Sequence, residues 1–254
     1  MYIYTKPTTD NLGQWIKFFW QEFHELFLDG VKWTLVISLS ATVIGLLIAI
    51  FITPIKIQKI TNRDRLFVKI LKRIGIILST VYVEVLRGTP MIVQAVIIYY
   101  MFLSGKVDII TSGIFIVSIN TSAYIVEVLR GSIEAIDKGQ MEAARSLGMT
   151  RAQAMFHIVI PQAIRNSIPA IGNEFVINIK DTAVLNVIAV TELFFVTDSI
   201  NGRYYRTYEA YIIAAILYLI MTFVTTRLLY LISNKLLNGN RNKIKISFPT
   251  SQSY

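Results

Sequence analysis

Stretches of mainly apolar residues alternate along the chain with short polar connections. The apolar stretches cover residues 33–52, 74–103, 109–129, 163–190 and 210–232. A membrane-spanning helix needs roughly 20 consecutive, mainly apolar residues, and each stretch reaches about that length. The pattern therefore predicts an all-α integral membrane protein with about five transmembrane helices. We expect one transmembrane domain over residues 31–232, preceded by a segment at 1–30 and followed by a tail at 233–254.

The segment before the first span carries aromatic residues at near-helical spacing among acidic residues. The aromatic set is Trp15, Phe18, Phe19, Trp20, Phe23 and Phe27. This pattern is typical of an amphipathic helix at the membrane interface, and we favour anchoring over contact with a partner protein. The first ten residues lack the basic-then-apolar pattern of a cleaved signal, so the first span is expected to remain in the mature protein.

Composition and charge support lipid as the solvent and predict an orientation. Hydrophobic residues make up 54% of the 254 residues and charged residues only 16%, with a net charge of +9. The basic residues gather in the loop at 54–73 and in the tail at 233–254, whereas the first 30 residues are mainly acidic. Because basic loops stay in the cytoplasm, we expect the N-terminus outside and the C-terminus inside. The charge thus reflects topology, and nucleic-acid binding is a remote alternative.

Several kinds of chemistry have no support in the sequence. It contains no cysteine and two isolated histidines, so neither a disulfide nor a metal site is predicted. No phosphate-binding loop, nucleophile elbow or metalloprotease motif occurs, which argues against an ATPase and against an integral-membrane enzyme. We therefore expect a non-catalytic protein, either a transport subunit or, less favoured, a binding or sensor subunit.

The predicted orientation places the loop at 134–163 in the cytoplasm, and this loop has its own helix signals. Good helix formers at 140–147 precede Gly148, the usual residue for a left-handed helix C-cap. Thr150 and Gln153 have the spacing of a capping box, and Pro161 is expected to end the second helix, which would fill residues 151–160. On these signals alone, a dock for another protein and a loop without a partner are equally supported.

The spacing within this loop resembles a known motif. Glu142-Ala143-Ala144, Gly148, then nine residues, then Ile158-Val159-Ile160-Pro161 resembles the EAA loop of binding-protein-dependent ABC importer permeases, although Ile160 stands where that family has leucine. Further matches are Glu84, Arg87-Gly88-Thr89-Pro90, Gln94, Tyr124, Glu127, Arg130-Gly131, Gly139-Gln140, Pro161-Gln162-Ala163 and Lys180-Asp181-Thr182. Together they are similar to the histidine, glutamine, arginine and opine permeases. Ala183-Val184 departs from the usual Ser-Leu of that branch.

The resemblance implies a type I ABC importer permease fold, located in the bacterial cell membrane with multiple spans. It implies that a separate ATPase, which holds ATP and Mg, grips residues 139–161, while this chain binds no cofactor. The coupling residues carried over are Gly139, Glu142, Ala143, Ala144, Gly148, Ile158 and Pro161. A second permease copy or a homologue, an extracellular substrate-binding protein and an amino acid substrate complete the implied assembly. An ion-coupled secondary amino acid transporter is the alternative, but five spans and an inner two-helix loop argue against it.

A short repeat, VEVLRG, places two acid–arginine pairs at i, i+3: Glu84 with Arg87, and Glu127 with Arg130. Counting back from the outer connection at Ser104 puts the first pair near the inner membrane boundary, and the second pair lies at similar depth near the inner end of the third span. They are expected either to form an ion-pair gate at the inner mouth or to snorkel to lipid headgroups. Downstream, Gly88 and Pro90 predict a hinge, because Pro90 lacks the N–H that would bond the Leu86 carbonyl.

Polar residues inside the spans mark a candidate substrate pathway, because they are costly in lipid. The set is Gln94, Asn120, Asn173, Glu174, Asn178, Lys180, Asp181 and Thr182. A zwitterionic amino acid needs acceptors for its ammonium and donors for its carboxylate, and this set offers both. Glu174 is the favoured contact. The alternative for Lys180 and Asp181 is an ion pair that only fixes two helices.

Overall fold

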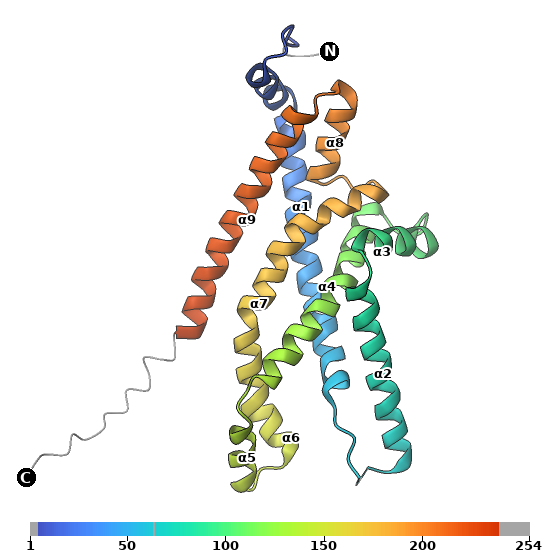
Figure 1. The fold of residues 1–254 in the computed structure, drawn as a ribbon, viewed down its shortest axis with the longest axis vertical. Helices are drawn as coiled ribbons and strands as arrows, with labels where there is room; N and C mark the ends of the chain where they lie inside the picture. The colour runs from blue at the N-terminus through green and yellow to red at the C-terminus, as the bar shows by residue number, and fades with distance from the viewer. Residues whose placement is uncertain (1–4, 63, 239–254) are drawn as a thin grey trace, which may run out of the picture.

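The computed structural model describes residues 5–62 and 64–238, and it contains helices and turns without strands over those residues. The five longest helices run roughly along the long axis of the molecule (Figure 1). They are α1 (Leu12–Ile57), α2 (Leu66–Gly88), α4 (Ile109–Glu134), α7 (Ile160–Asp181) and α9 (Thr207–Asn238). Arg63 and the tail residues Arg241, Lys243 and Lys245 lie outside the described residues.

By length and composition, α1, α4 and α9 each could cross a membrane, and a bent helical pair, 151–188 with 193–204, is a fourth candidate. The helix α2 packs beside α1 and α4. It is not apolar enough to count as a further candidate span, because five charged residues lie along it: Lys69, Lys72, Arg73, Glu84 and Arg87. Thus the five predicted spans correspond to five long helices, of which α2 is the most polar.

The predicted second span, residues 74–103, is broken. The helix α2 ends at Gly88, and after Thr89 the chain turns into α3 (Met91–Ile98) and a π-helical turn, η1 (Tyr99–Leu103). These elements lie across the direction of α2 instead of extending it (Figure 1). The break is where Pro90 predicts it. Counting residues back from Ser104 assumed a straight span, so the break removes that basis for the depth of Glu84 and Arg87, and their depth stays a prediction.

Five of the six N-terminal aromatic residues pack inside the protein, and only Trp20 of that set is exposed, at 41%, which corrects the expected anchoring to lipid. The helix α1 begins after Asn11, whose side-chain oxygen accepts from the Gln14 N–H, and it continues without interruption into the first span. Trp15, Phe19 and Phe27 are 3%, 0% and 0% exposed. They contact residues of α8 (Leu193–Tyr204) and α9.

The centre of the fold is the close crossing of α1 and α4. A Cβ added at Gly45 would lie 3.1 Å from the Ser118 carbonyl oxygen and 3.2 Å from the Ser122 nitrogen, so a larger residue would push the helices apart. Near this crossing, Asn178 of α7 donates to Thr42 Oγ1 at 2.9 Å and accepts from Thr121 Oγ1 at 3.0 Å. These bonds tie α7 to both helices, because buried polar groups need partners.

The loop that resembles the EAA motif consists of α5 (Lys138–Ser146), α6 (Arg151–Ala154) and a π-helical turn, η2 (Met155–Val159), at one end of the molecule (Figure 1). The prediction that Pro161 ends the second helix is wrong. Pro161 lies in the first turn of α7, where a missing N–H costs little, and the helical backbone runs from Arg151 into α7 through η2. At its other end, α7 leads through the 3-10 helix η3 (Thr182–Ile188) into α8.

Candidate functional site

The joint between α5 and α6 is built on Gly148. Its φ of +89° is left-handed, as the sequence predicts. The Gly148 N–H donates to the Arg145 carbonyl at 3.0 Å, and the Met149 N–H donates to the Ala144 carbonyl at 3.2 Å. These two bonds form a Schellman motif, which satisfies the last carbonyls of α5. Nothing lies within 4 Å of a Cβ built at Gly148, so only its backbone conformation favours glycine.

The start of α6 is fixed by the predicted capping box. Thr150 N–H donates to Gln153 Oε1 at 2.8 Å, and Gln153 N–H donates to Thr150 Oγ1 at 3.3 Å. A third contact joins the loop to α7, because Gln162 Nε2 donates to Gln140 Oε1 at 2.6 Å. The two short helices are therefore held by local bonds and by α7, and they form a defined knob.

The knob presents both polar and apolar residues to its surroundings. Glu142, Ala143 and Gly139 are exposed, whereas Ala144 is buried under the fold of the loop. Leu147 is 87% exposed and Phe156 is 67% exposed. Phe156 lies in η2 and lines an apolar cavity beside the long helices, whereas Leu147 stands at the joint itself. An apolar side chain as exposed as Leu147 at such a joint is typical of a surface that meets another protein. Ile158 is half-buried and Pro161 is exposed at the start of α7.

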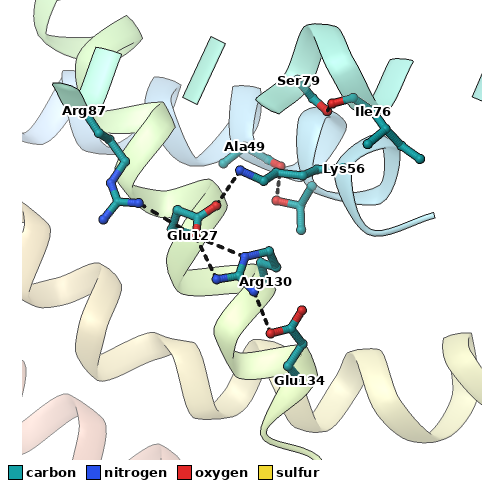
Figure 2. A network of polar contacts seen from close by, with 9 residues as sticks. Ala49, Lys56, Ile76, Ser79, Arg87, Glu127, Arg130 and Glu134 are labelled. Carbon is teal, nitrogen blue, oxygen red and sulfur yellow. Dashed lines mark hydrogen bonds and ion pairs between the residues drawn. The ribbon is translucent and has the colours of Figure 1, made fainter. Parts of the chain in front are cut away.

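Glu127 of α4 is the centre of an ion-pair cluster (Figure 2). Its Oε1 lies 2.7 Å from Lys56 Nζ, and its Oε2 lies 2.8 Å from Arg130 Nη2 and 3.7 Å from Arg87 Nη1. Arg130 also pairs with Glu134 at 2.6 Å. The cluster therefore connects the ends of α1 and α2 to α4. Glu127 is only 18% exposed, so three surrounding cations balance a largely buried carboxylate.

The two copies of the repeat behave differently, which corrects the predicted pairing. Glu127 and Arg130 pair along α4, but Glu84 is exposed and forms no ion pair among the described residues. Arg87 instead reaches across to Glu127 and lies over the Tyr124 ring, with its guanidinium carbon 5.4 Å from the ring centroid. Lys56 was not predicted. In the sequence it is one of several cations in the loop at 54–73, and only its short distance to Glu127 in the structure distinguishes it from the others.

Gln94 and Asn120 form a clasp at the hinge. Gln94 Nε2 donates to the Leu86 carbonyl at 2.8 Å and to the Thr89 carbonyl at 3.0 Å, and Asn120 Nδ2 donates to Gln94 Oε1 at 2.9 Å. The carbonyl that Pro90 leaves free is thus satisfied by a side chain. Both amides are 7% exposed, so a substrate could reach them only if these bonds opened.

The polar residues of α7 divide into two groups. Asn178 and Thr182 are 3% and 0% exposed and bond within the fold. Asn173 and Lys180 are exposed, and Glu174 and Asp181 are half-buried. No ion pair joins Lys180 or Asp181 to another helix in the described part of the chain.

The predicted pathway residues do not line the apolar cavity of this chain. A cavity of about 520 Å³ lies between α1, α4, α7 and α9, and its walls are almost entirely apolar. None of the eight predicted pathway residues contributes to it. The polar residues that remain accessible, Asn173, Glu174, Lys180 and Asp181, therefore lie outside this cavity.

Residues 66–238 match the family model described as binding-protein-dependent transport system inner membrane component. The chain is 32% identical over 219 residues to the L-cystine transport system permease protein of Bacillus subtilis, with 85% of this chain and 88% of that protein covered. It is 36% identical over 155 residues to the glutamine transport system permease protein of Escherichia coli, with coverage of 59% and 71%.

Solved structures agree with these relatives. A crystal structure of an amino acid ABC transporter with histidines superposes with a TM-score of 0.76 and 37% identity, covering 90% of this chain and 100% of that chain. An inward-facing structure of the methionine ABC transporter gives a TM-score of 0.68 at 16% identity, covering 84% and 97%, and this match concerns the fold alone. The predicted permease fold is confirmed.

Proposed function

Because this chain belongs to the family of inner membrane components of binding-protein-dependent transport systems, we propose that it is the permease subunit of an ATP-binding-cassette importer for a polar amino acid. It is a multi-pass protein of the cell membrane, and a separate ATPase subunit hydrolyses ATP. The relatives that support an amino acid substrate are the cystine and glutamine permeases and the amino acid transporter structure. An ion-coupled secondary transporter is not favoured.

The coupling knob carries the proposal. Residues 139–161 form two capped helices around Gly148, and Leu147 and Phe156 stand exposed beside them. An ATPase that binds ATP and Mg would grip this surface, with Leu147 as an apolar anchor in a pocket of the partner. The knob continues through η2 into α7, so a movement of the ATPase would be transmitted directly to a membrane helix.

A paired substitution tests the docking of the ATPase. Gly148→Asp should abolish co-purification of the cognate ATPase, because a charged side chain and a strained backbone enter the joint. Gly105→Asp is the matched control, since Gly105 also has a positive φ, +73°, and open space around its Cα, but lies beyond the end of η1. Recovery of the ATPase with Gly148→Asp at the level of the control would overturn the proposal.

We place the substrate pathway between this chain and a second permease, either another copy or a homologue. The accessible polar residues Asn173, Glu174, Lys180 and Asp181 do not line the apolar cavity of the single chain, so a second subunit would complete their site. Glu174 would accept hydrogen bonds from the ammonium of the amino acid. The Glu127 cluster would close the inner side of this path and open as α2 bends at Gly88 and Pro90.

The substrate itself can be identified through the extracellular binding protein. Thermal stabilisation of the cognate binding protein by a panel of amino acids should select one or a few polar amino acids. The same amino acids should then be taken up by proteoliposomes that contain the permease, its ATPase and ATP. Uptake that depends on an ion gradient and not on ATP would contradict the proposed function.

A further inference from the structure

The apolar cavity of this chain is elongated along two helices. Its walls follow α1 from Leu39 to Pro54 and α7 from Ile160 to Phe175, and residues of α4, α9 and η2 complete them. We call this cavity the α1–α7 groove. Each of the two stretches extends about 22 Å at 1.5 Å per residue. One lipid chain spans about half of the roughly 30 Å hydrocarbon core, so the groove is long enough to hold a complete chain.

The α1–α7 groove offers no partner to a polar ligand. Among its lining residues, only Thr42, Thr53 and Ser167 carry polar side-chain atoms. Their hydroxyls already donate to main-chain carbonyls of their own helices, at 2.8, 2.7 and 2.8 Å respectively. A charged or zwitterionic solute would lose its water there without gaining hydrogen bonds. The volume of about 520 Å³ therefore favours an apolar occupant, because cavities with such walls bind apolar molecules.

The groove opens at the surface of the membrane-spanning helices. Leu39, Ile50 and Ile164 line it and are nevertheless 54%, 48% and 52% exposed. Residues 33–55 of α1 carry no charge, and α1 is a candidate membrane span. Side chains exposed within such a span meet lipid chains, because the bilayer core holds no water. None of the eight predicted pathway residues lines the groove, so it is not part of the proposed substrate pathway.

Cations outnumber carboxylates in the helix ends that flank the groove near the coupling knob, the end of the molecule that carries α5 and α6 (Figure 1). Each of the four segments there contributes lining residues: 54–60, 127–138, 151–165 and 227–235. Together they contain eight lysines or arginines against three carboxylates, Glu127, Glu134 and Asp137. Basic residues that border a membrane span attract anionic lipid headgroups. The charge at this end therefore complements a headgroup with a net negative charge.

We propose that the α1–α7 groove binds one acyl chain of an anionic membrane phospholipid, whose headgroup lies at the end of the groove beside the coupling knob. The bound chain fills the space between α1 and α7, where Phe156 of η2 forms part of the wall. Since η2 joins the knob to α7, an occupied groove restrains the movement that the knob passes to α7. The binding itself requires only a membrane location and does not depend on the proposed import function.

The test uses the full-length chain, which contains no cysteine, so that one introduced thiol can be labelled selectively. Ile164→Cys carries a fluorescent label at the opening of the groove. Ile220→Cys is the matched control, since Ile220 is also 52% exposed but lies on α9 outside the groove. Each labelled protein is reconstituted in phosphatidylcholine vesicles with an increasing fraction of phosphatidylglycerol that has brominated acyl chains. Bromine quenches only a fluorophore that it contacts, so quenching measures lipid occupancy at each position.

Half-maximal quenching at Ile164→Cys should need a roughly threefold lower fraction of brominated phosphatidylglycerol than at Ile220→Cys. Brominated phosphatidylcholine should quench the two positions alike. Adding Ile50→Trp to Ile164→Cys narrows the groove and should remove the preference for phosphatidylglycerol. Adding Ile77→Trp, at a 54% exposed position on α2, should preserve it. If Ile164→Cys does not insert into the membrane, Ile50→Cys replaces it as the labelled position and Leu46→Trp as the narrowing substitution.

Three results would overturn the proposal. Equal fractions of phosphatidylglycerol at the two positions would mean that Ile164 meets only bulk lipid. No quenching at Ile164→Cys by either lipid would mean that a second permease covers the groove. A preference that survives Ile50→Trp would place the phospholipid outside the groove. Amino acid uptake and ATP hydrolysis play no part in this measurement, so its failure is distinguishable from a failure of the proposed import function.

Discussion

Lys56 Nζ lies 2.7 Å from Oε1 of Glu127, and this pair joins the end of α1 to α4 beside the coupling end of the molecule (Figure 2). Lys56 is 14% exposed and Glu127 is 18% exposed, so both charges are largely removed from solvent. A largely buried carboxylate with three cations around it holds several helix ends in one arrangement. The strength of this cluster is therefore expected to set how readily α1, α2 and α4 separate.

Glu127→Gln should lower the stability of the permease by about 2 kcal/mol, because it removes charged hydrogen bonds and leaves the surrounding cations without their shared partner. The apparent melting temperature of the detergent-solubilised protein measures the effect. Glu134→Gln is the control, since Glu134 is 63% exposed and its pair with Arg130 should contribute less than about 1 kcal/mol. Equal shifts for the two variants would contradict a central role of Glu127.

Gln94→Leu should loosen the hinge, because the Leu86 carbonyl would lose its 2.8 Å bond from the side-chain amide. The Leu86 carbonyl would keep only the 3.4 Å bond from Asn120 Nδ2, and the lost side-chain bond should cost about 1 kcal/mol. The amides of Met91 and its neighbours should then exchange hydrogen faster in hydrogen–deuterium exchange. Gln58→Leu provides the comparison, since Gln58 makes one longer bond, 3.3 Å, to the Lys72 carbonyl. Unchanged exchange around Pro90 would show that the clasp does not hold the hinge.

Gly45→Ala should destabilise the crossing of α1 and α4, although alanine favours a helix. The new Cβ would meet backbone atoms at 3.1 and 3.2 Å, and such overpacking typically costs 1–3 kcal/mol, roughly. Gly131→Ala should have the opposite sign, a gain of roughly 0.5–1 kcal/mol, because nothing lies within 4 Å of its added Cβ. The melting temperatures of the two variants, measured side by side, test this prediction. A higher melting temperature in both would mean that α1 and α4 can move apart at their crossing with little cost.

Substitutions of Asn178 and Asn173 should distinguish a role in helix packing from a role in transport. Asn178→Leu removes bonds to Thr42 and Thr121 and should cost about 0.6–2 kcal/mol of stability. Asn173→Leu changes an exposed residue, so it should leave the melting temperature unchanged while reducing substrate uptake in proteoliposomes several-fold. Normal uptake with Asn173→Leu would remove this residue from the proposed pathway.

The parts of the structure that the sequence predicted correctly are set by local interactions. The Schellman motif at Gly148 and the capping box of Thr150 and Gln153 connect residues three to five positions apart. The break at Pro90 follows equally from one missing N–H. The prediction that Pro161 ends a helix also rested on neighbouring residues alone, but it was wrong. It failed because the π-helical turn η2 shifts the helix so that Pro161 falls in a first turn.

The sequence by itself determined that the chain is a helical membrane protein with two short helices in the loop at 134–163, because apolar length, charge placement and capping are properties of consecutive residues. Only the tertiary structure decided that Arg87 turns from Glu84 to Glu127, that Lys56 completes the cluster, and that the aromatic face before the first span packs against α8. Helical spacing states which residues share a face. The neighbour that this face meets depends on how distant helices pack, and the identical i, i+3 pairs of the repeat acquire different partners for that reason.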